Sequence, residues 1–552
     1  MRRVTSAAGD TGVDRVTGGM WTTLVAMTIA ASMILVDQTA VPLAVPRAVN
    51  DLGGSLDESQ WIMTANILPL AAFMVLGGHL GDLLGLRRVF LTGAVVFALA
   101  TTVAGLSQNM PMMIGARLVQ GCSAALMMPT TMAIVSATFP SPRRGFALGV
   151  LAGGSAFFAA LGPVLGGILT SIDWRLVFLV NVPLAVIAGV LTLRRPDPRG
   201  TRPKGGPIDV PGAVTLALAL GALVYGLSQG QASGWGSTVV VGSVGGGLVL
   251  LAAFVGIEQR SRSPLIEFRL LRHLNFLAAN ISQLLAGMVE LGLGYLLPYL
   301  LLLVIGVDPL VAGIALIPST LPIVLAGPLA GRAFDRIGGR APLVVGFLLL
   351  AASGIALALA AGAISAWALI PGLVLQGLGL GIVLTVNDPT GLTAVPERDQ
   401  GVAAGMLNTS EQLGGAIGIA VLVAIELSYY LDQLYDRLAV RGIRPTAAQT
   451  EQGREFILQA EQIGLNRAAE EARDNPVIQL ALQDLIAAHI SGFRLAFIVS
   501  AGIAVAGALA CFALVRQKGR EVEGPIFTRR SRWILAHPGS TPAVTRQPAD
   551  AP

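Results

Sequence analysis

Long apolar windows alternate with short polar loops along this chain of 552 residues. Each window holds about twenty residues or more, the length of an α-helix that crosses a bilayer core of about 30 Å. The pattern therefore predicts an all-α polytopic membrane protein with fourteen transmembrane helices. The predicted spans are 20–43, 60–80, 89–107, 111–137, 146–170, 175–193, 211–229, 238–257, 274–304, 310–330, 342–362, 366–387, 400–427 and 493–515.

The cations between the windows test this count, because short cytoplasmic loops carry an excess of Lys and Arg. With the N-terminus inside, seventeen cations fall in short inner loops and only two, Arg47 and Arg175, in short outer loops. One span more or fewer would destroy this asymmetry, so we expect both tails, 1–19 and 516–552, to be cytoplasmic. Arg supplies 35 of the 37 cations, which together with the Ala and Gly content indicates a high-GC genome and a bacterial cytoplasmic membrane.

Composition narrows the function classes. Charged residues make up 12% of the chain and aromatic residues 5%, whereas glycine occurs 67 times. Soluble domains carry about 25% charged residues, and small residues suit closely packed membrane helices better than β-barrels. The net charge of +5 follows from orientation in the membrane, so no nucleic-acid partner is expected. Cys122 and Cys511 lie inside apolar windows, which argues against a disulfide or a metal site.

Two segments depart from the scheme of helices and short loops. Residues 194–210 form a basic linker rich in Pro and Gly. Residues 428–492 form a long outer segment with nine acidic and six basic residues, and its last part, 476–490, has an apolar face. We expect this outer segment to be largely helical and to be a solvated decoration, with a partner-binding or lid role as the alternative.

Two inner loops share the pattern Gly-x3-Asp-x2-Gly-x-Arg. One follows the second span and the other the tenth, and the matching positions are displaced by 253 residues: Gly78, Asp82, Gly85 and Arg87 correspond to Gly331, Asp335, Gly338 and Arg340. Transporters are often built from duplicated helix bundles. The repeat therefore predicts two six-helix bundles, 20–193 and 273–515, with residues 194–272 as a linker and two inserted helices.

The same displacement relates two acids that lie deep in predicted spans, Asp37 in the first and Glu290 in the ninth. An ionised carboxylate in hydrocarbon costs a few kcal/mol or more (about 3 on insertion scales), and such residues usually face a cavity and mark an ion or substrate path. We therefore predict that both acids couple protons or contact substrate. The alternative is a structural acid that is permanently paired.

The energy source follows from motifs that the sequence lacks. A pump driven by ATP needs Gly-x4-Gly-Lys-Ser/Thr, and both lysines, Lys204 and Lys518, are followed by glycine. The chain contains no His-Glu-x2-His zinc motif, and none of its four histidines precedes an Asp by five residues. We therefore expect no ATP, metal or other cofactor, and an ion gradient as the driving force. One charge crossing about 100 mV gains roughly 2.3 kcal/mol.

Five motifs in register identify a family. The first span carries Asp37-Gln38-Thr39-Ala40-Val41, the next loop runs from Gly78 to Arg88, and the fourth span carries Arg117-Leu118-Val119-Gln120-Gly121. The fifth span contains Gly149, Gly162, Pro163, Gly166 and Gly167, and Asp173-Trp174-Arg175 follows it. Over residues 20–515 the chain resembles the major facilitator superfamily, specifically the fourteen-spanner drug:proton antiporters of the EmrB/QacA type.

The resemblance implies roles for these residues. Asp82 would form an inner gate with Arg87 and Arg88, although Leu83 and Leu86 replace the usual basic residues of this loop. In the family, the arginine at the position of Arg117 takes part in proton transfer, and a structural tie to a neighbouring helix is the alternative here.

Further along the chain, the resemblance implies that the glycines and Pro163 of the fifth span seal or hinge the two bundles, unless they serve plain helix packing. Phe158 stands where that motif usually has glycine. Glu411 stands where the family often has arginine. It is either a third buried acid or a residue at the inner mouth of the cavity.

Together these features predict a major facilitator fold and a secondary transporter that works as a monomer in the lipid bilayer. We expect Asp37 and Glu290 to bind protons and substrate-linked charge alternately while the bundles rock, so that an amphipathic, cationic small molecule is exported. Export of a lipid, a siderophore or an endogenous metabolite on the same scaffold is an alternative. A membrane scaffold or sensor that transports nothing is a more remote one.

Overall fold

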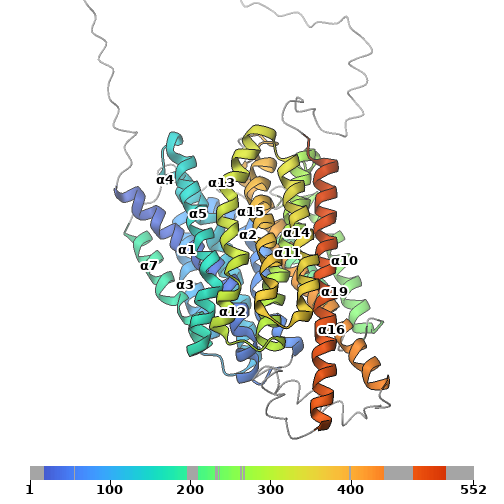
Figure 1. The fold of residues 1–552 in the computed structure, drawn as a ribbon. Coiled ribbons are helices and arrows are strands. Elements are labelled where there is room, and N and C mark those ends of the chain that lie inside the picture. The colour runs from blue at the N-terminus through green and yellow to red at the C-terminus, as the bar shows by residue number, and fades with distance from the viewer. Residues whose placement is uncertain are drawn as a thin grey trace, which may run out of the picture.

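The computed structural model describes residues 18–54, 56–194, 209–229, 234, 236–261, 264, 266, 268–396, 400–440 and 476–516, and every regular element among them is a helix. The tails, most of the predicted basic linker and the middle of the predicted outer segment lie outside these residues. The helices run side by side as one elongated bundle (Figure 1). Large apolar side chains on its periphery, such as Leu359, Leu329 and Val249, are two-thirds or more exposed, as expected of a surface that faces lipid.

Each predicted span coincides with a helix or a pair of consecutive helices. They are α1 (Gly18–Asp51), α2 (Leu56–Leu84), α3 (Leu86–Gly105), α4 (Met110–Thr138), α5 (Ser141–Ile172), α6 (Arg175–Leu179) with α7 (Asn181–Leu193), α8 (Val210–Ser228), α10 (Thr238–Glu258), α11 (Leu274–Tyr299) with the π-helical turn η2 (Leu300–Val304), α12 (Pro309–Ala315) with α13 (Ile317–Ile337), α14 (Arg340–Ala360) with the 3₁₀ turn η3 (Ala361–Ala363), the 3₁₀ turn η4 (Ala366–Leu369) with α15 (Ile370–Leu392), α16 (Gln400–Val440) and α19 (Pro476–Leu514). Thirteen spans in the described residues are long and apolar enough to cross a membrane, and α2, with 29 residues, occupies the place of the predicted span 60–80.

The helix contacts repeat between the two halves of the chain, as the sequence displacement predicts. In the first half α1 packs on α5, α2 on α4, and α3 on α4 and α7. In the second half α11 packs on α16, α13 on α15, and α14 on α15 and α19. The paired loop glycines also match in conformation, because Gly85 (φ 99°) and Gly338 (φ 76°) both adopt the left-handed region that favours glycine. The two six-helix bundles are therefore internal repeats.

Small residues allow the close approach of helices within each bundle. A Cβ added at Gly166 of α5 would lie 2.6 Å from the carbonyl oxygen of Ala40 in α1. In the other bundle, a Cβ at Gly414 of α16 would lie 1.9 Å from the carbonyl oxygen of Leu284 in α11. Backbones in such contact gain dispersion energy without side chains between them, which is how membrane helices pack when lipid is as apolar as their own surface.

The inserted helices α8 and α10 pack on each other, and α8 also contacts α2 and α16. The predicted outer segment needs a correction at both ends. Helix α16 continues beyond 428 to Val440, and α19 begins at Pro476 rather than at 493. Residues 428–440 continue the helix of the span before them, and residues 476–492 form the first turns of the helix of the span after them. The prediction ended each span where its apolar run weakened.

The ends of the helices sort into two groups that agree with the predicted loop positions. Towards the upper end in Figure 1, the backbone N–H of Arg516 donates to Asn275 Oδ1 (2.7 Å), which joins the end of α19 to the start of α11. At the opposite end Arg175 binds Asp51 at 2.6 Å, and its guanidinium lies 4.4 Å from the Trp174 ring centroid. The charge pattern assigns the first end to the cytoplasm, and the terms inner and outer are used in this sense.

The packing of α5 on α1 generates a prediction. Substituting Gly166→Ala places a methyl group against the Ala40 backbone, and the overpacking should cost about 1–3 kcal/mol. Gly149→Ala is the matched control on the same helix, because an added Cβ there meets nothing within 4 Å. Thermal unfolding of the purified protein in detergent should show a lower midpoint for Gly166→Ala and an unchanged or slightly higher one for Gly149→Ala. Equal midpoints for the two variants would contradict the close packing.

Candidate functional site

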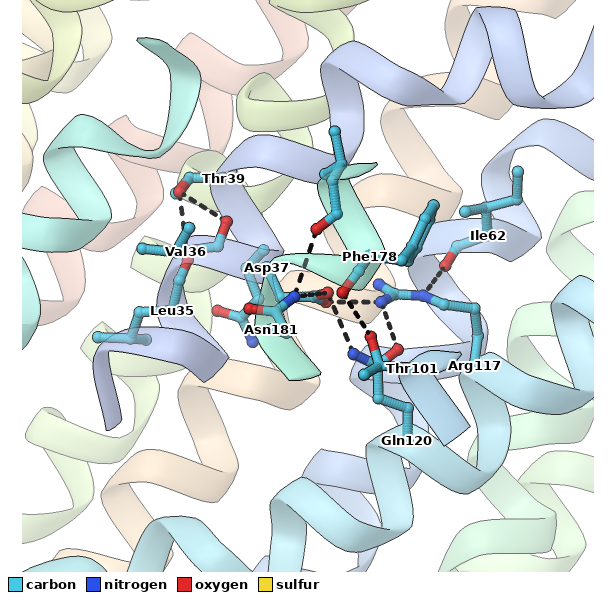
Figure 2. Close-up of polar contacts among 12 residues, drawn as sticks. Leu35, Val36, Asp37, Thr39, Ile62, Thr101, Arg117, Gln120, Phe178 and Asn181 are labelled. Carbon is cyan, nitrogen blue, oxygen red and sulfur yellow. Dashed lines mark hydrogen bonds and ion pairs between the residues drawn. The ribbon is translucent and has the colours of Figure 1, made fainter. Parts of the chain in front are cut away.

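Asp37 lies at the centre of a buried polar network in the N-terminal bundle (Figure 2). Its Oδ2 accepts a 2.6 Å ion-pair bond from Nη1 of Arg117, and its Oδ1 accepts a bond of 3.1 Å from Gln120 Nε2. Gln120 closes the ring, because its Oε1 also accepts from Arg117 Nη1 at 2.8 Å. Asn181 Nδ2 adds a longer contact of 3.4 Å to Asp37 Oδ1. We call Asp37, Arg117, Gln120 and Asn181 the N-bundle network.

The helices α1, α4 and α7 supply this network, and α2 and α6 hold its arginine in place. The Nε atom of Arg117 donates to the Ile62 carbonyl oxygen at 2.7 Å, and its guanidinium lies 5.6 Å from the ring centroid of Phe178. The side chains of Arg117 and Asp37 are 0% and 2% exposed. An ion pair this dry holds two compensating charges, and removing either partner strands the other.

The acids of the C-terminal bundle lie in a different environment. Glu290 on α11 sits at the position that the repeat pairs with Asp37, yet its buried Oε2 has no hydrogen-bond partner among the described residues. Helices α11 and α16 touch backbone to backbone next to it, because a Cβ at Gly287 would lie 2.1 Å from the carbonyl oxygen of Glu411. This contact brings Glu411 to within one helical turn of Glu290.

Glu411 belongs to a chain of polar side chains that leads towards the inner end. Gln283 Nε2 donates to Glu411 Oε2, and Gln283 Oε1 accepts from Asn387 Nδ2. Asn387 also donates to the Ala279 carbonyl oxygen at 2.9 Å. The carboxylate of Glu411 interacts electrostatically with those of Glu290 and Asp388. Glu411 is thus half-buried beside two other acids, which combines the two interpretations that its sequence position left open.

Asp388 was missed in the sequence, although it completes this set. Its side chain is exposed in the structure, near the inner end of α15 and directly before Pro389. The predicted span ended at residue 387, so Asp388 fell directly outside it. The Asn387-Asp388-Pro389 sequence at the edge of an apolar window was the only available signal. We call Glu290, Asp388 and Glu411 the C-bundle acids.

The two bundles meet beside both centres. Gln38, next to Asp37, donates through Nε2 to Oε1 of Gln412, next to Glu411, at 3.0 Å. Nearer the outer end, the hydroxyl oxygens of Ser59 and Tyr295 are 2.8 Å apart. These contacts join α1 to α16 and α2 to α11, so the acids of one bundle lie next to residues that touch the other.

The fifth-span motif divides into three parts. Gly162 and Gly166 pack against α1, where an added Cβ at Gly162 would lie 1.8 Å from Thr39 Oγ1. Pro163 and Gly167 face α12 of the other bundle, where an added Cβ at Gly167 would lie 2.4 Å from the Pro309 carbonyl oxygen. Gly149 is exposed, and a Cβ added there would meet nothing within 4 Å. Packing within a bundle and closure between bundles are therefore both present, at different residues of one motif.

The inner-loop residues lie apart from these centres. Arg87 donates through Nη2 to the Leu193 carbonyl oxygen, and the Arg340 guanidinium lies 4.3 Å from the ring centroid of Phe512. A Cβ added at Gly78 would lie at an ordinary 3.4 Å from the Cβ of Pro129 in α4. Arg88 and Asp335 are exposed. The side chain of Asp82 lies outside the described part, so its predicted pairing with the arginines stays a prediction.

Comparison with known proteins identifies the family. The sequence profile of the Major Facilitator Superfamily matches residues 27–419. The chain belongs to the major facilitator superfamily. It is 32% identical over 525 residues to the tetracenomycin C resistance and export protein of Streptomyces glaucescens, covering 92% of this chain and 94% of that protein. It is 33% identical over 435 residues to the cephamycin export protein of Amycolatopsis lactamdurans, covering 76% and 87%.

Solved structures confirm the major facilitator fold. A bacterial homologue of the human lysosomal transporter Spinster, in an inward-facing and unoccupied conformation, superposes with a TM-score of 0.63 at 16% identity, over 91% of this chain and 98% of that one. The xylose transporter XylE of E. coli, in a partially occluded inward-open conformation, gives 0.55 at 12% identity over 91% and 99%. This major facilitator protein is therefore a multi-pass membrane transporter.

The N-bundle network generates a prediction. Asp37→Asn leaves the Arg117 guanidinium buried without a counter-charge, and it should destabilise the protein by about 3–5 kcal/mol. Arg117→Met should cost a similar amount, because it strands the carboxylate. The double variant removes both charges and should be more stable than either single variant. A double-mutant cycle of unfolding free energies in detergent measures the coupling between the two residues. If the losses in the two single variants add up to the loss in the double variant, Asp37 and Arg117 are not coupled.

Proposed function

We propose that this transporter exports amphipathic, cationic small molecules from a bacterial cell in exchange for protons. The observation that carries the proposal is the C-bundle acids. The carboxylates of Glu290 and Asp388 both lie within electrostatic reach of that of Glu411, and no Arg or Lys pairs with any of the three in the part of the chain that the structure describes.

Negative charges on Glu290 and Glu411, which are half-buried, and on Asp388 repel one another, and protons or a bound cation would relieve this repulsion. Protons and a cationic substrate would therefore compete for the same oxygen atoms, and such competition is the chemical basis of antiport. Asp388 lies exposed near the inner end of α15, and Glu411 and Glu290 are half-buried, so in this proposal the acids form a series that starts at the inner end. A cation entering from the cytoplasm would meet them in that order.

In this proposal the N-bundle network is the second half of the coupling. A proton that binds Asp37 cancels the charge that holds Arg117, so the guanidinium must find other acceptors such as Gln120. The contact between Gln38 and Gln412 gives this rearrangement a direct route to the neighbour of Glu411. Asp37 and Glu290 would thus keep the alternating roles that the sequence suggested, with Glu411 and Asp388 added on the substrate side.

The direction of transport rests on the proton gradient and on the relatives. Protons entering from outside would neutralise the acids, weaken the hold on a cation and favour its release. Both termini would be cytoplasmic, and a single chain would be the transport unit, without ATP. The names of two relatives, which are export proteins for tetracenomycin C and cephamycin, support export. They also favour a second candidate function, the export of an endogenous metabolite through the same acids.

Substitution of the acids tests the proposal. Glu290→Gln, Glu411→Gln and Asp388→Asn each remove one charge without changing shape, and each should reduce proton flux driven by a cationic substrate by roughly tenfold or more, as expected when a bond to a charged group is lost. Asp37→Asn should also abolish coupling. The matched control is Asp173→Asn, because Asp173 is an exposed acid at the outer end and should leave the flux unchanged.

The measurement is proton flux in proteoliposomes, recorded with a panel of amphipathic cations and neutral molecules of similar size. Full proton-driven efflux in both Asp37→Asn and Glu290→Gln would overturn the coupling assignment. Equal fluxes with cations and neutral molecules would overturn the choice of cationic substrates while leaving export intact. Absence of substrate-dependent flux for every compound would favour a scaffold or sensor.

A further inference from the structure

A buried histidine–carboxylate pair lies near the outer end of the C-terminal bundle, away from the acids described above. His489 on α19 and Glu426 on α16 are 1% and 3% exposed, and His489 Nδ1 is 3.2 Å from Glu426 Oε1. The ring of Tyr430 stacks on the imidazole, with centroids 3.7 Å apart and planes 9° from parallel. The sequence placed His489 in the predicted outer segment, and nothing there suggested this pair.

The pair has the chemistry of a proton-binding site. One proton can be shared between the two groups, either as imidazolium beside carboxylate or as carboxylic acid donating to a neutral imidazole. Loss of this proton leaves a carboxylate buried against a neutral ring, which is costly without water. His489 Nε2 is also buried, and it has no hydrogen-bond partner among the described residues, so Glu426 is the hydrogen-bond partner of the imidazole there.

A column of aromatic rings connects the pair to the contact between the bundles. The His489 ring centroid is 6.5 Å from that of Phe493, which is 6.2 Å from Tyr299. Tyr299 stacks on Tyr295 at 6.1 Å, and the Tyr295 hydroxyl meets Ser59 of the N-terminal bundle at 2.8 Å. The π-helical turn η2 begins directly after Tyr299, and such irregular turns often mark functional positions in helices.

We propose that His489 and Glu426 form a second proton-binding site, separate from the C-bundle acids, whose occupancy sets how firmly the outer ends of the two bundles are closed. In the closed structure the pair is dry and needs its proton. Separation of the bundles releases Tyr295 from Ser59 and loosens the ring column, so water can solvate a bare carboxylate. The closed state therefore binds the proton more tightly, and acid favours closure while alkali favours opening.

Other ionisable groups lie on the same helices and turns, and substitutions at His489 and Glu426 distinguish the effect of the pair from theirs. Tyr430, Tyr299 and Tyr295 are the ionisable groups stacked within the ring column, and helix α2, which packs on α16, carries Glu58 near its outer end. The charged residues of the outer halves of α16 and α19 in the described ranges are Asp432, Asp436, Arg437, Asp484 and Arg494. Helix α14 and turns η2 and η3 contribute no ionisable group near this end.

The test measures the separation of the outer ends directly and does not depend on transport. Spin labels are placed at Leu106→Cys and Trp367→Cys, two exposed outer positions on different bundles, in a background of Cys122→Ala and Cys511→Ala. Distance distributions in liposomes are recorded between pH 5.5 and 8.5. If the closed state binds one proton more than the open state, the ratio of closed to open populations changes by at most about tenfold per pH unit. We expect this ratio to change by roughly threefold or more over the range measured.

Two substitutions at the pair separate titration from packing. His489→Phe keeps a ring against Tyr430, and Glu426→Gln keeps the shape of its partner, so both should fold and both should lose the pH response. His273→Gln, at the inner end of α11, is the control histidine and should keep it. Tyr295→Phe should reduce closure at every pH without removing the response, because it deletes only the hydroxyl contact to Ser59.

Two results would overturn the proposal. In one, the labelled protein that keeps His489 and Glu426 shows a distance distribution that does not change with pH. In the other, His489→Phe and Glu426→Gln show the same pH response as that protein. Thermal unfolding of each variant in detergent checks that it is folded. Because no substrate is present, failure of this test leaves the proposed export of cations untouched, and failure of export leaves this test valid.

Discussion

An ionised side chain inside a membrane must be paired, protonated or hydrated, and this constraint governs the whole structure. It keeps almost all of the charge in the loops, and it places the few remaining charged groups where one of the three solutions is available. Asp37 and Arg117 use pairing, at exposures of 2% and 0%. Asp388 has an exposed side chain near the inner end of α15. Glu290 is half-buried, and one of its oxygens is buried without a described partner.

The internal repeat makes this contrast informative. Asp37 and Glu290 occupy equivalent positions on equivalent helices, so the same backbone geometry carries an acid in two different environments. In the N-terminal bundle, Arg117 and Gln120 hold the carboxylate in a fixed ring of bonds. In the C-terminal bundle Glu290 interacts electrostatically with Glu411, which also interacts with Asp388. The duplicated scaffold therefore holds one acid in an ion pair and the other beside a further acid.

The sequence was sufficient for the features that depend on length and period. Apolar windows located the helices, and one displacement of 253 residues linked Gly85 to Gly338 and Asp37 to Glu290, because duplication preserves both spacing and backbone conformation. Arg117 was identified as a buried cation, but its partner could be chosen only from the fold. Nothing in the sequence shows which helices touch, since α1 meets α4 and α7 across long separations in the chain.

The misses have a common physical origin. Asp388 stands one residue beyond the predicted span 366–387, and Glu426 stands in the last turn of the predicted span 400–427, since a rule based on hydropathy ends a span where its apolar run weakens. The helix itself continues, because a membrane helix is held by its hydrogen bonds and by its neighbours as well as by lipid. Gln283 and Asn387 were missed because neutral amides carry no charge signal, although they position Glu411. Polar residues at the ends of predicted spans therefore merit the same attention as those in the middle.

The contact between α5 and α12 has a consequence for the passage of protons between the two bundles. At Gly167 and Gly313 the two bundles meet through backbone atoms, with no room for another side chain. A junction made of glycine and carbonyl groups offers no titratable side chain and no space for a file of water molecules. In the proposed antiport, such a junction would give protons no titratable side chain to pass along between α5 and α12.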